Sequence, residues 1–222
     1  MINAKYQSES ERMVIDMGYT LPLEQISLAD YQQLLQKQNL LPSRRMLHEQ
    51  LEARFSLLAG AGLTSVAQLA QALATPNKLS ALAAKTGIPE EYLTLLRREL
   101  GSLTQKPVPL ADFPGCDKAQ IQILANSGIR NSREYWENPV DREGVLFALC
   151  DLVRINGVGA VAARAFYEAG FGSVSAVAGA TASDMLKRVS AVNEKEGYYK
   201  AILGEKDMQF CIDYARLLER YR

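Results

Sequence analysis

Two glycines that bracket one valine, Gly157-Val158-Gly159, form the stretch of this sequence best suited to chemistry. Glycine turns tightly and lets another molecule approach the backbone closely, because it has no side chain. Where such a turn opens a helix, the unpaired N–H groups favour an anion such as phosphate. The stretch therefore predicts either a phosphate cradle, made by the amides of Gly157, Gly159 and Ala160, or a turn that only packs two helices.

Few basic side chains accompany this turn. We expect the nucleic-acid-binding residues to be Gly157, Val158, Gly159 and Ala160. Arg154 precedes this turn and Arg164 follows it, and we expect these two residues to supply charge to the bound phosphate. Contacts of this kind do not depend on base sequence. The positions after the second glycine, 160–162, are alanine, valine and alanine rather than lysine or arginine, which favours the packing role.

Other kinds of site lack the residues that they need. The only histidine, His48, and three widely separated cysteines, Cys116, Cys150 and Cys211, are too few for a zinc site, and we expect buried, reduced thiols in a cytoplasmic protein. The aspartates show no spacing for acid–base work, and His48 has no identifiable nucleophilic partner. We therefore expect no cofactor, no metal and no enzymatic activity.

The glycine pattern also fits a dinucleotide fingerprint, Gly157-x-Gly159-x-x-Ala162. That fingerprint needs a buried β-strand before the first glycine. Asp151 and Arg154 stand where such a strand would carry valine or isoleucine, and the segment after the motif is typical of a short helix. A dinucleotide site is therefore disfavoured.

The elements around the turn are predicted to be helices, because apolar residues recur with helical spacing and no alternating β pattern is present. The apolar stripes are Leu28, Tyr31 and Leu35; Leu47, Leu51, Phe55 and Leu58; Leu93, Leu96 and Leu100; and Met208, Cys211, Ala215 and Leu218. An uncharged window at 55–77 could span a bilayer, but its glycines and polar residues predict two short buried helices. We predict an all-α fold of short helices.

Three helix ends look alike: a small residue, a glycine (Gly62, Gly128 or Gly170), an apolar residue and then a capping residue. Glycine adopts the left-handed conformation that closes a helix, and the apolar residue folds back onto the last turn. Serine, threonine or asparagine then caps the next helix. One such unit cannot bury its apolar face alone, so we expect the copies to stack.

The repeats predict a division into a helical lead-in and three units. The ranges are 1–41 for the lead-in, 42–105 for the first unit, 106–140 for a degenerate second unit and 141–222 for the third unit with a C-terminal helix. A proline-bearing linker is expected at 101–110.

The segment from Leu152 to Phe166 resembles the helix-hairpin-helix motif, whose pattern is apolar-x-x-apolar-Pro-Gly-apolar-Gly, three residues and alanine. Asn156 replaces the proline, and the matching residues are Leu152, Ile155, Gly157, Val158, Gly159 and Ala163. A weaker copy begins at Leu110 and has Asp117 at the second glycine position, so we expect that copy to be structural. The resemblance implies that the hairpin amides and the following helix start hold a nucleic-acid phosphate.

From about residue 40 onward the chain also resembles an uncharacterised bacterial family, a numbered domain of unknown function related to helix-hairpin-helix proteins. The resemblance rests on "LLPSRRMLHEQLEARFSLLAGAGLTSVAQL", "KTGIPEEYLTLLRREL", "FPGCDKAQIQILANSGI" and "DLVRINGVGAVAARAFYEAG". That family has no established activity, so the resemblance implies the fold rather than the function.

Charge limits the kind of partner. The chain carries 25 basic and 25 acidic residues, balanced as ten of each in residues 1–105, so any nucleic-acid affinity must come from a local patch. The start, "MINAKYQSESER", is too polar for a signal peptide. Our leading hypothesis is weak, sequence-independent binding to the phosphate backbone of DNA or another nucleic acid. The alternative is a protein–protein interaction scaffold in which the turns only pack.

Overall fold

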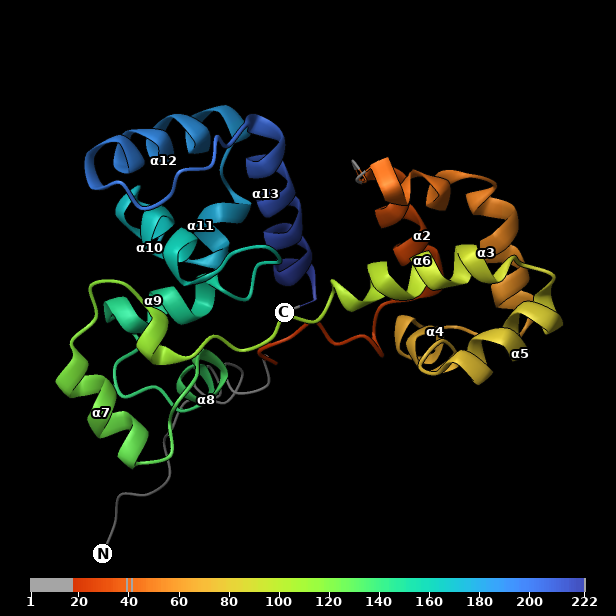
Figure 1. Ribbon diagram of the computed structural model, residues 1–222, viewed down its shortest axis with the longest axis horizontal. Helices are drawn as coiled ribbons and strands as arrows, with labels where there is room; N and C mark the ends of the chain where they lie inside the picture. The colour runs from red at the N-terminus through yellow and green to blue at the C-terminus, as the bar shows by residue number, and fades with distance from the viewer. Residues whose placement is uncertain (1–17, 39, 41, 222) are drawn as a thin grey trace, which may run out of the picture.

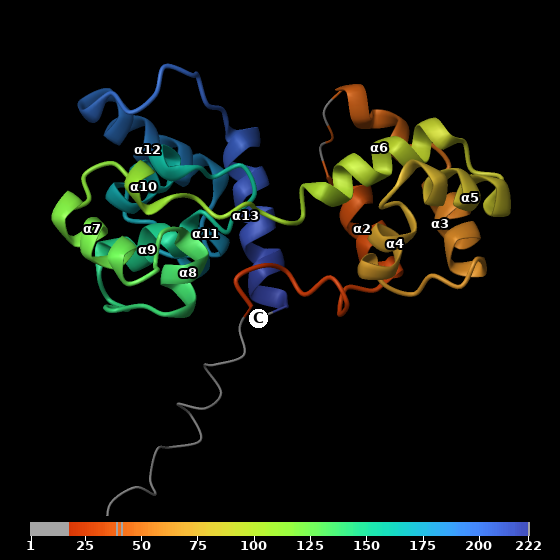
Figure 2. The same ribbon diagram turned by 60° about the horizontal axis from the view of Figure 1, so that its bottom comes forward.

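The computed structural model describes residues 18–38, 40 and 42–221. Every regular element in these ranges is a helix, so the all-α prediction is confirmed. The helices form two lobes that two chain segments connect (Figures 1 and 2). We call residues 22–101 the N-lobe, and residues 102–221 with 18–21 the C-lobe. The part of the predicted lead-in at 1–17 lies outside the described residues.

The N-lobe contains the predicted stripes and one departure from them. Its elements are α2 (Leu28–Lys37), the 3-10 helix η1 (Pro42–His48), α3 (Leu51–Gly60), α4 (Val66–Ala72), α5 (Pro76–Thr86) and α6 (Glu90–Gly101). The uncharged window at 55–77 holds the end of α3, all of α4 and the start of α5, so it is divided by turns as predicted, but these helices are buried on one face only and not throughout. The stripe from Leu47 to Leu58 does not lie on one helix, because Gln50 is left-handed, with φ of 50°, and separates η1 from α3.

The C-lobe holds the glycine turn singled out in the sequence. Its elements are η2 (Leu110–Asp112), α7 (Lys118–Asn126), α8 (Ser132–Glu137), α9 (Val145–Leu152), α10 (Ala160–Glu168), α11 (Val174–Ala178), α12 (Ala182–Glu196) and α13 (Glu205–Arg220). The long helix α13 packs against α11 and α12, and α10 packs against α9 and α12. No helix among the described residues is long and apolar enough to cross a membrane.

The three similar helix ends have one geometry, which confirms the predicted repeat. Gly62, Gly128 and Gly170 have φ of 93°, 88° and 85°. After each glycine, the N–H of the apolar residue donates to the carbonyl five residues earlier, in the pairs Leu63 to Leu58 at 3.3 Å, Ile129 to Leu124 at 2.9 Å and Phe171 to Phe166 at 2.9 Å. This is the hydrogen bond that closes a helix with a left-handed glycine. Side chains then cap the next helices, as predicted.

We expect Gly62→Ala to lower the free energy of unfolding by about 1–2 kcal/mol, because alanine is strained at a positive φ. A side chain at Gly62 would meet no atom within 4 Å, so strain alone sets the cost. Gly60 has the same open surroundings but lies in α3. Gly60→Ala should therefore raise stability, by up to about 1 kcal/mol. Urea unfolding measures both variants, and equal effects would contradict this explanation.

The start of the second helix in each copy is tied to an earlier part of the chain. The Val66 N–H donates to the Ile26 carbonyl at 2.9 Å, and the Ser132 N–H donates to the Val108 carbonyl at 2.8 Å. These bonds belong to short antiparallel bridges. In the third copy the equivalent N–H, that of Val174, donates instead to the Asp151 carboxylate at 2.8 Å. A buried side chain thus replaces a backbone acceptor there.

The segment Gly18–Leu21 packs against the C-lobe, and the chain then continues into the N-lobe. The Tyr19 side chain is 2% exposed. Its hydroxyl hydrogen-bonds that of Ser132 at 2.6 Å, and its ring meets Trp136 edge-on. Burial raises the pKa of Tyr19 to about 12, so this phenol stays neutral. The second connection between the lobes is irregular and runs from the end of α6 to η2.

Candidate functional site

The Gly157 turn is a hairpin between two helices of the C-lobe. It follows α9, and α10 begins at Ala160. Ile155 and Val158 are 0% and 5% exposed, so their side chains anchor the turn in the core. Gly157 has φ of 83°, which favours glycine, and both Gly157 and Gly159 are exposed. The hairpin therefore presents its backbone, rather than its side chains, to solvent.

The start of α10 has no side-chain cap. The Val158 N–H donates to the Ile155 carbonyl at 3.1 Å within the turn. Gly159 is the N-cap of α10 and provides no side-chain cap. Among the described residues no side chain caps the start of α10, where the helix end is partially positive.

The fold requires glycine at position 157 but not at position 159. Gly157 needs its positive φ. Gly159 has φ of −88° and ψ of 179°, which any residue adopts, and a side chain there would meet no protein atom within 4 Å. The fold itself thus makes no steric demand for glycine at position 159. A bare backbone at this point leaves room for something outside the chain.

Two related turns are closed by their own side chains. The weaker copy predicted at Leu110 has Gly115 with φ of 71°, followed by Asp117 as the N-cap of α7. The Asp117 carboxylate accepts from the Ala119 N–H at 2.9 Å. At the turn between α11 and α12, the Thr181 hydroxyl accepts from the Asp184 N–H at 3.4 Å. Of these hairpins, the one at Gly157 is uncapped.

The structure contradicts the expected role of Arg154. Its side chain is only 8% exposed and forms an ion pair with Asp151. Its guanidinium also donates to the carbonyls of Tyr19 and Gly18, at 3.0 and 3.4 Å, and lies over the Trp136 ring. Arg154 therefore holds the Gly18–Leu21 segment and is not free to meet a phosphate at the hairpin.

Arg164 lies at a different turn from the one predicted. Its Nε donates to the Glu168 carboxylate at 2.6 Å, and its guanidinium packs over Gly115. Partial burial opposes ionisation of Glu168, but hydrogen bonds from Arg164 and Tyr198 outweigh it and hold the pKa of Glu168 below its usual value. The charge of Arg164 is therefore offset, and it sits on the weaker hairpin.

Several other side chains whose chemistry would suit nucleic acid or metal have partners within the protein or are buried. Arg44 pairs with the buried Glu99. Trp136 is 8% exposed and donates to Asp151, so it packs rather than presenting a ring to bases. Cys150 and Cys211 are buried free thiols, whereas Cys116 is half-buried. Across the described ranges, no cluster of three or more metal-binding side chains occurs.

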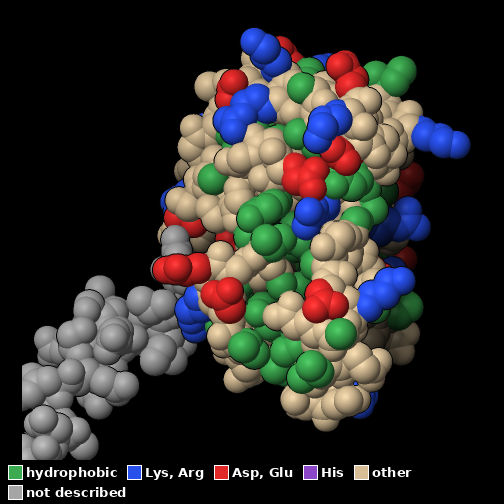
Figure 3. All heavy atoms as spheres, turned by 90° about the vertical axis from the view of Figure 1, so that its left-hand side faces the viewer, with side chains coloured by type: hydrophobic (Ala, Val, Ile, Leu, Met, Phe, Trp, Pro, Cys, Tyr) green, Lys and Arg blue, Asp and Glu red, His purple; other side chains and the backbone are tan. Residues whose placement is uncertain are grey.

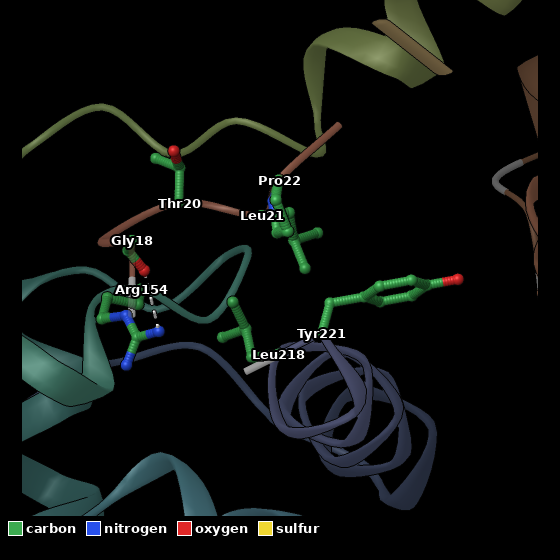
Figure 4. A pocket seen from close by; sticks show the side chains of 7 residues that line it. All are labelled: Gly18, Thr20, Leu21, Pro22, Arg154, Leu218 and Tyr221. Carbon is green, nitrogen blue, oxygen red and sulfur yellow. Dashed lines mark hydrogen bonds between the residues drawn. The ribbon is translucent and has the colours of Figure 1, made fainter. Parts of the chain in front are cut away.

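A small recess lies where the Gly18–Leu21 segment meets the end of α13 (Figure 4). Its lining includes Arg154, which points at the Gly18 carbonyl, and Leu218 and Tyr221 of the α13 end. The volume of about 10 Å³ suits roughly one water molecule. The recess is thus too small for a cofactor.

Apolar side chains gather on the side of the C-lobe where α7 and α10 lie (Figure 3). Ile123 of α7 is 66% exposed and Val161 of α10 is 39% exposed. Leu124 is the buried side chain of α7, so most of this helix faces solvent. This surface adjoins the helix that follows the hairpin and suits a protein partner better than a charged polymer.

Comparison with known proteins agrees with this geometry. Residues 150–196 match the SAM-like helix-hairpin-helix tandem family. The matched segment runs from the end of α9 through α12 and includes the whole Gly157 hairpin. No curated protein and no solved structure matches the chain. The resemblance to an uncharacterised bacterial family stays a prediction.

Proposed function

We propose that this protein is a non-enzymatic binding protein that contacts the phosphate backbone of nucleic acid through the Gly157 hairpin. The match of residues 150–196 to the SAM-like helix-hairpin-helix tandem family supports this proposal. The amides of Gly157, Gly159 and Ala160 would donate hydrogen bonds to the oxygens of one phosphate group at the start of α10. Arg154 and Arg164 have no part in this contact, because both are engaged elsewhere.

The observation that carries the proposal is the bare N-cap at Gly159. Side chains of serine, threonine, asparagine or aspartate cap α2, α4, α5, α7, α8, α11 and α12, whereas glycine is the N-cap of α9, α10 and α13. A side chain that begins at Gly159 would meet no atom within 4 Å, so serine or aspartate would fit there. A side-chain cap would stabilise α10 by a few tenths of a kcal/mol or more relative to glycine. Leaving the amides open therefore sacrifices a little stability, as a binding site does.

The proposal predicts a weak interaction. A phosphate contact made by neutral amides, without lysine or arginine, releases few counterions, so log affinity should change little with log salt. Binding should be similar for different base sequences, since only the backbone is touched. The measurement is titration of the purified protein into labelled DNA and RNA oligonucleotides at low and moderate salt.

Gly159→Asp is expected to weaken binding at least about tenfold, because its carboxylate occupies the amides and repels phosphate. The same variant should be as stable as the wild type or slightly more stable, because aspartate is a favourable N-cap. Anisotropy titration and urea unfolding of one preparation test both halves. Weaker binding together with unchanged or higher stability would show that the variant loses the binding site and not the fold.

Gly204→Asp is the matched control, because it adds the same charge at the N-cap of α13, where the backbone is also extended. It should leave nucleic-acid binding within about twofold of the wild type. Equal losses in both variants would mean that net charge, not the hairpin, governs binding. Unchanged binding in Gly159→Asp would overturn the proposal.

A protein–protein interaction scaffold is the second candidate function. The exposed apolar side chains of α7 and α10 favour it, since Ile123 and Val161 lie outside any core. In that case the same titrations would show no binding to DNA or RNA even at low salt.

A further inference from the structure

The first of the two chain crossings between the lobes is short and is held on both sides. On the C-lobe side, the Tyr19 carbonyl accepts from Arg154 at 3.0 Å. On the N-lobe side, the Leu23 carbonyl accepts from the Ala67 N–H of α4 at 3.1 Å. The chain therefore changes lobe between Tyr19 and Leu23, next to the end of α13 (Figures 1 and 2).

The second crossing changes lobe at Leu103. Its N–H donates to the Leu100 carbonyl at the end of α6 at 3.0 Å, and its carbonyl accepts from the Tyr214 hydroxyl of α13 at 2.7 Å. Among the described residues, every pair of helices in extensive contact lies within one lobe. Two short crossings without a large interface between the lobes permit rotation about the line that joins the crossings.

An ion pair outside the crossings joins the two lobes directly. Arg220, in the last turn of α13, donates to the carboxylate of Asp30, in the first turn of α2, at 2.9 Å. The Ser27 hydroxyl donates to the other oxygen of this carboxylate at 2.8 Å and fixes its direction. The Ser27 hydrogen bond and the charge of Arg220 outweigh burial and hold the pKa of Asp30 below its usual value. The carboxylate is therefore ionised at neutral pH.

The pair of Asp30 and Arg220 is accessible enough to be broken. The Arg220 side chain is 59% exposed and that of Asp30 is 29% exposed. An ion pair of this kind is weak and is screened by salt. The pair of Arg154 and Asp151, which anchors the first crossing, is buried and is screened much less. The crossings should therefore stay fixed under conditions in which the pair between the lobes opens.

We propose that the ion pair of Asp30 and Arg220 is a salt-sensitive latch that fixes the angle between the two lobes, and that the lobes rotate about residues 20–22 and Leu103 when it opens. This device does not depend on nucleic-acid binding. Ionic strength would then set how the Gly157 hairpin of the C-lobe is oriented relative to the N-lobe.

The distance between one spin label on α5 and one on α12 reports on the angle between the lobes. The labels are attached through Lys78→Cys and Lys187→Cys, because both lysines are exposed. Cys116→Ser removes the half-buried thiol, and Cys150 and Cys211 are buried and should not react. Double electron–electron resonance then gives the distance distribution at low and at high salt.

The wild type should give one narrow distance distribution at low salt. Arg220→Met should depopulate that distance about two- to fivefold, which is the contribution of one exposed ion pair. High salt should broaden the wild-type distribution in the same way, and should add little to the effect of Arg220→Met. Asp30→Asn should behave like Arg220→Met, whereas Arg220→Lys keeps the charge and should stay close to the wild type.

Arg216→Met is the matched control, because Arg216 is another exposed arginine of α13 but donates to the Ala178 carbonyl within the C-lobe. It should leave the distance distribution unchanged, and circular dichroism checks that each variant is folded. A wild-type distribution in folded Arg220→Met at low salt would overturn the proposal. Equal broadening in Arg216→Met, or a wild-type distribution that high salt does not change, would also overturn it.

Discussion

Arg154→Met is expected to lower the free energy of unfolding by roughly 3–5 kcal/mol, because it leaves Asp151 as a buried charge without its partner. Asp151 and Arg154 are 9% and 7% exposed. The same substitution removes the donors to the Tyr19 and Gly18 carbonyls and the cation that lies 4.4 Å from the Trp136 ring centroid. The loss should therefore include release of the Gly18–Leu21 segment from the C-lobe.

Denaturant unfolding followed by circular dichroism measures this loss. The fluorescence of Trp136, the single tryptophan of the chain, reports on the contact between Arg154 and the Trp136 ring. Arg164→Met is the comparison variant, because its ion pair with Glu168 is more exposed and should contribute less than about 1 kcal/mol. If both variants lost the same amount of stability, Arg154 would be no more than another surface arginine.

Features that depend on neighbours in the chain could be predicted from the sequence. The glycine helix ends and their caps are local, since the donors and acceptors lie within five residues of one another. The all-α fold and the uncapped hairpin follow from such patterns. Asp117 as a cap, rather than a phosphate ligand, also follows from its position before a helix.

Features that join distant parts of the chain could not be predicted from one sequence. Tyr19 and Arg154 are 135 residues apart in the sequence, and this spacing does not predict the hydrogen bond between them. The i,i+3 pair of Asp151 and Arg154 was the available signal, yet a pair at that spacing is more often a solvated helix face. The sequence therefore predicted that Arg154 contacts a phosphate, whereas in the structure Arg154 holds the Gly18–Leu21 segment. The predicted domain boundaries stay predictions.

The neighbouring arginines Arg44 and Arg45 carry the second large prediction. Residues 31–48 contain no acidic residue, so the sequence around these two arginines would favour a small positive patch. In the structure Arg44 pairs with Glu99, whose side chain is 7% exposed, whereas Arg45 is exposed. Glu99 also lies near Tyr31, and burial, with this carboxylate adding to it, raises the pKa of the Tyr31 hydroxyl well above its ordinary value. Arg44 is thus the partly exposed counterion of a buried carboxylate in the N-lobe.

Arg44→Met is expected to destabilise the protein by about 2–4 kcal/mol, because Glu99 loses its counterion while buried. Arg45→Met should change stability by less than about 0.5 kcal/mol, as exposed substitutions do. In the double variant Arg44→Met with Glu99→Leu no charge is left unpaired, so most of the loss should be recovered. Chemical denaturation measures the free energy of unfolding of each of these variants. A double variant as unstable as Arg44→Met would mean that the pair contributes through packing and not through charge.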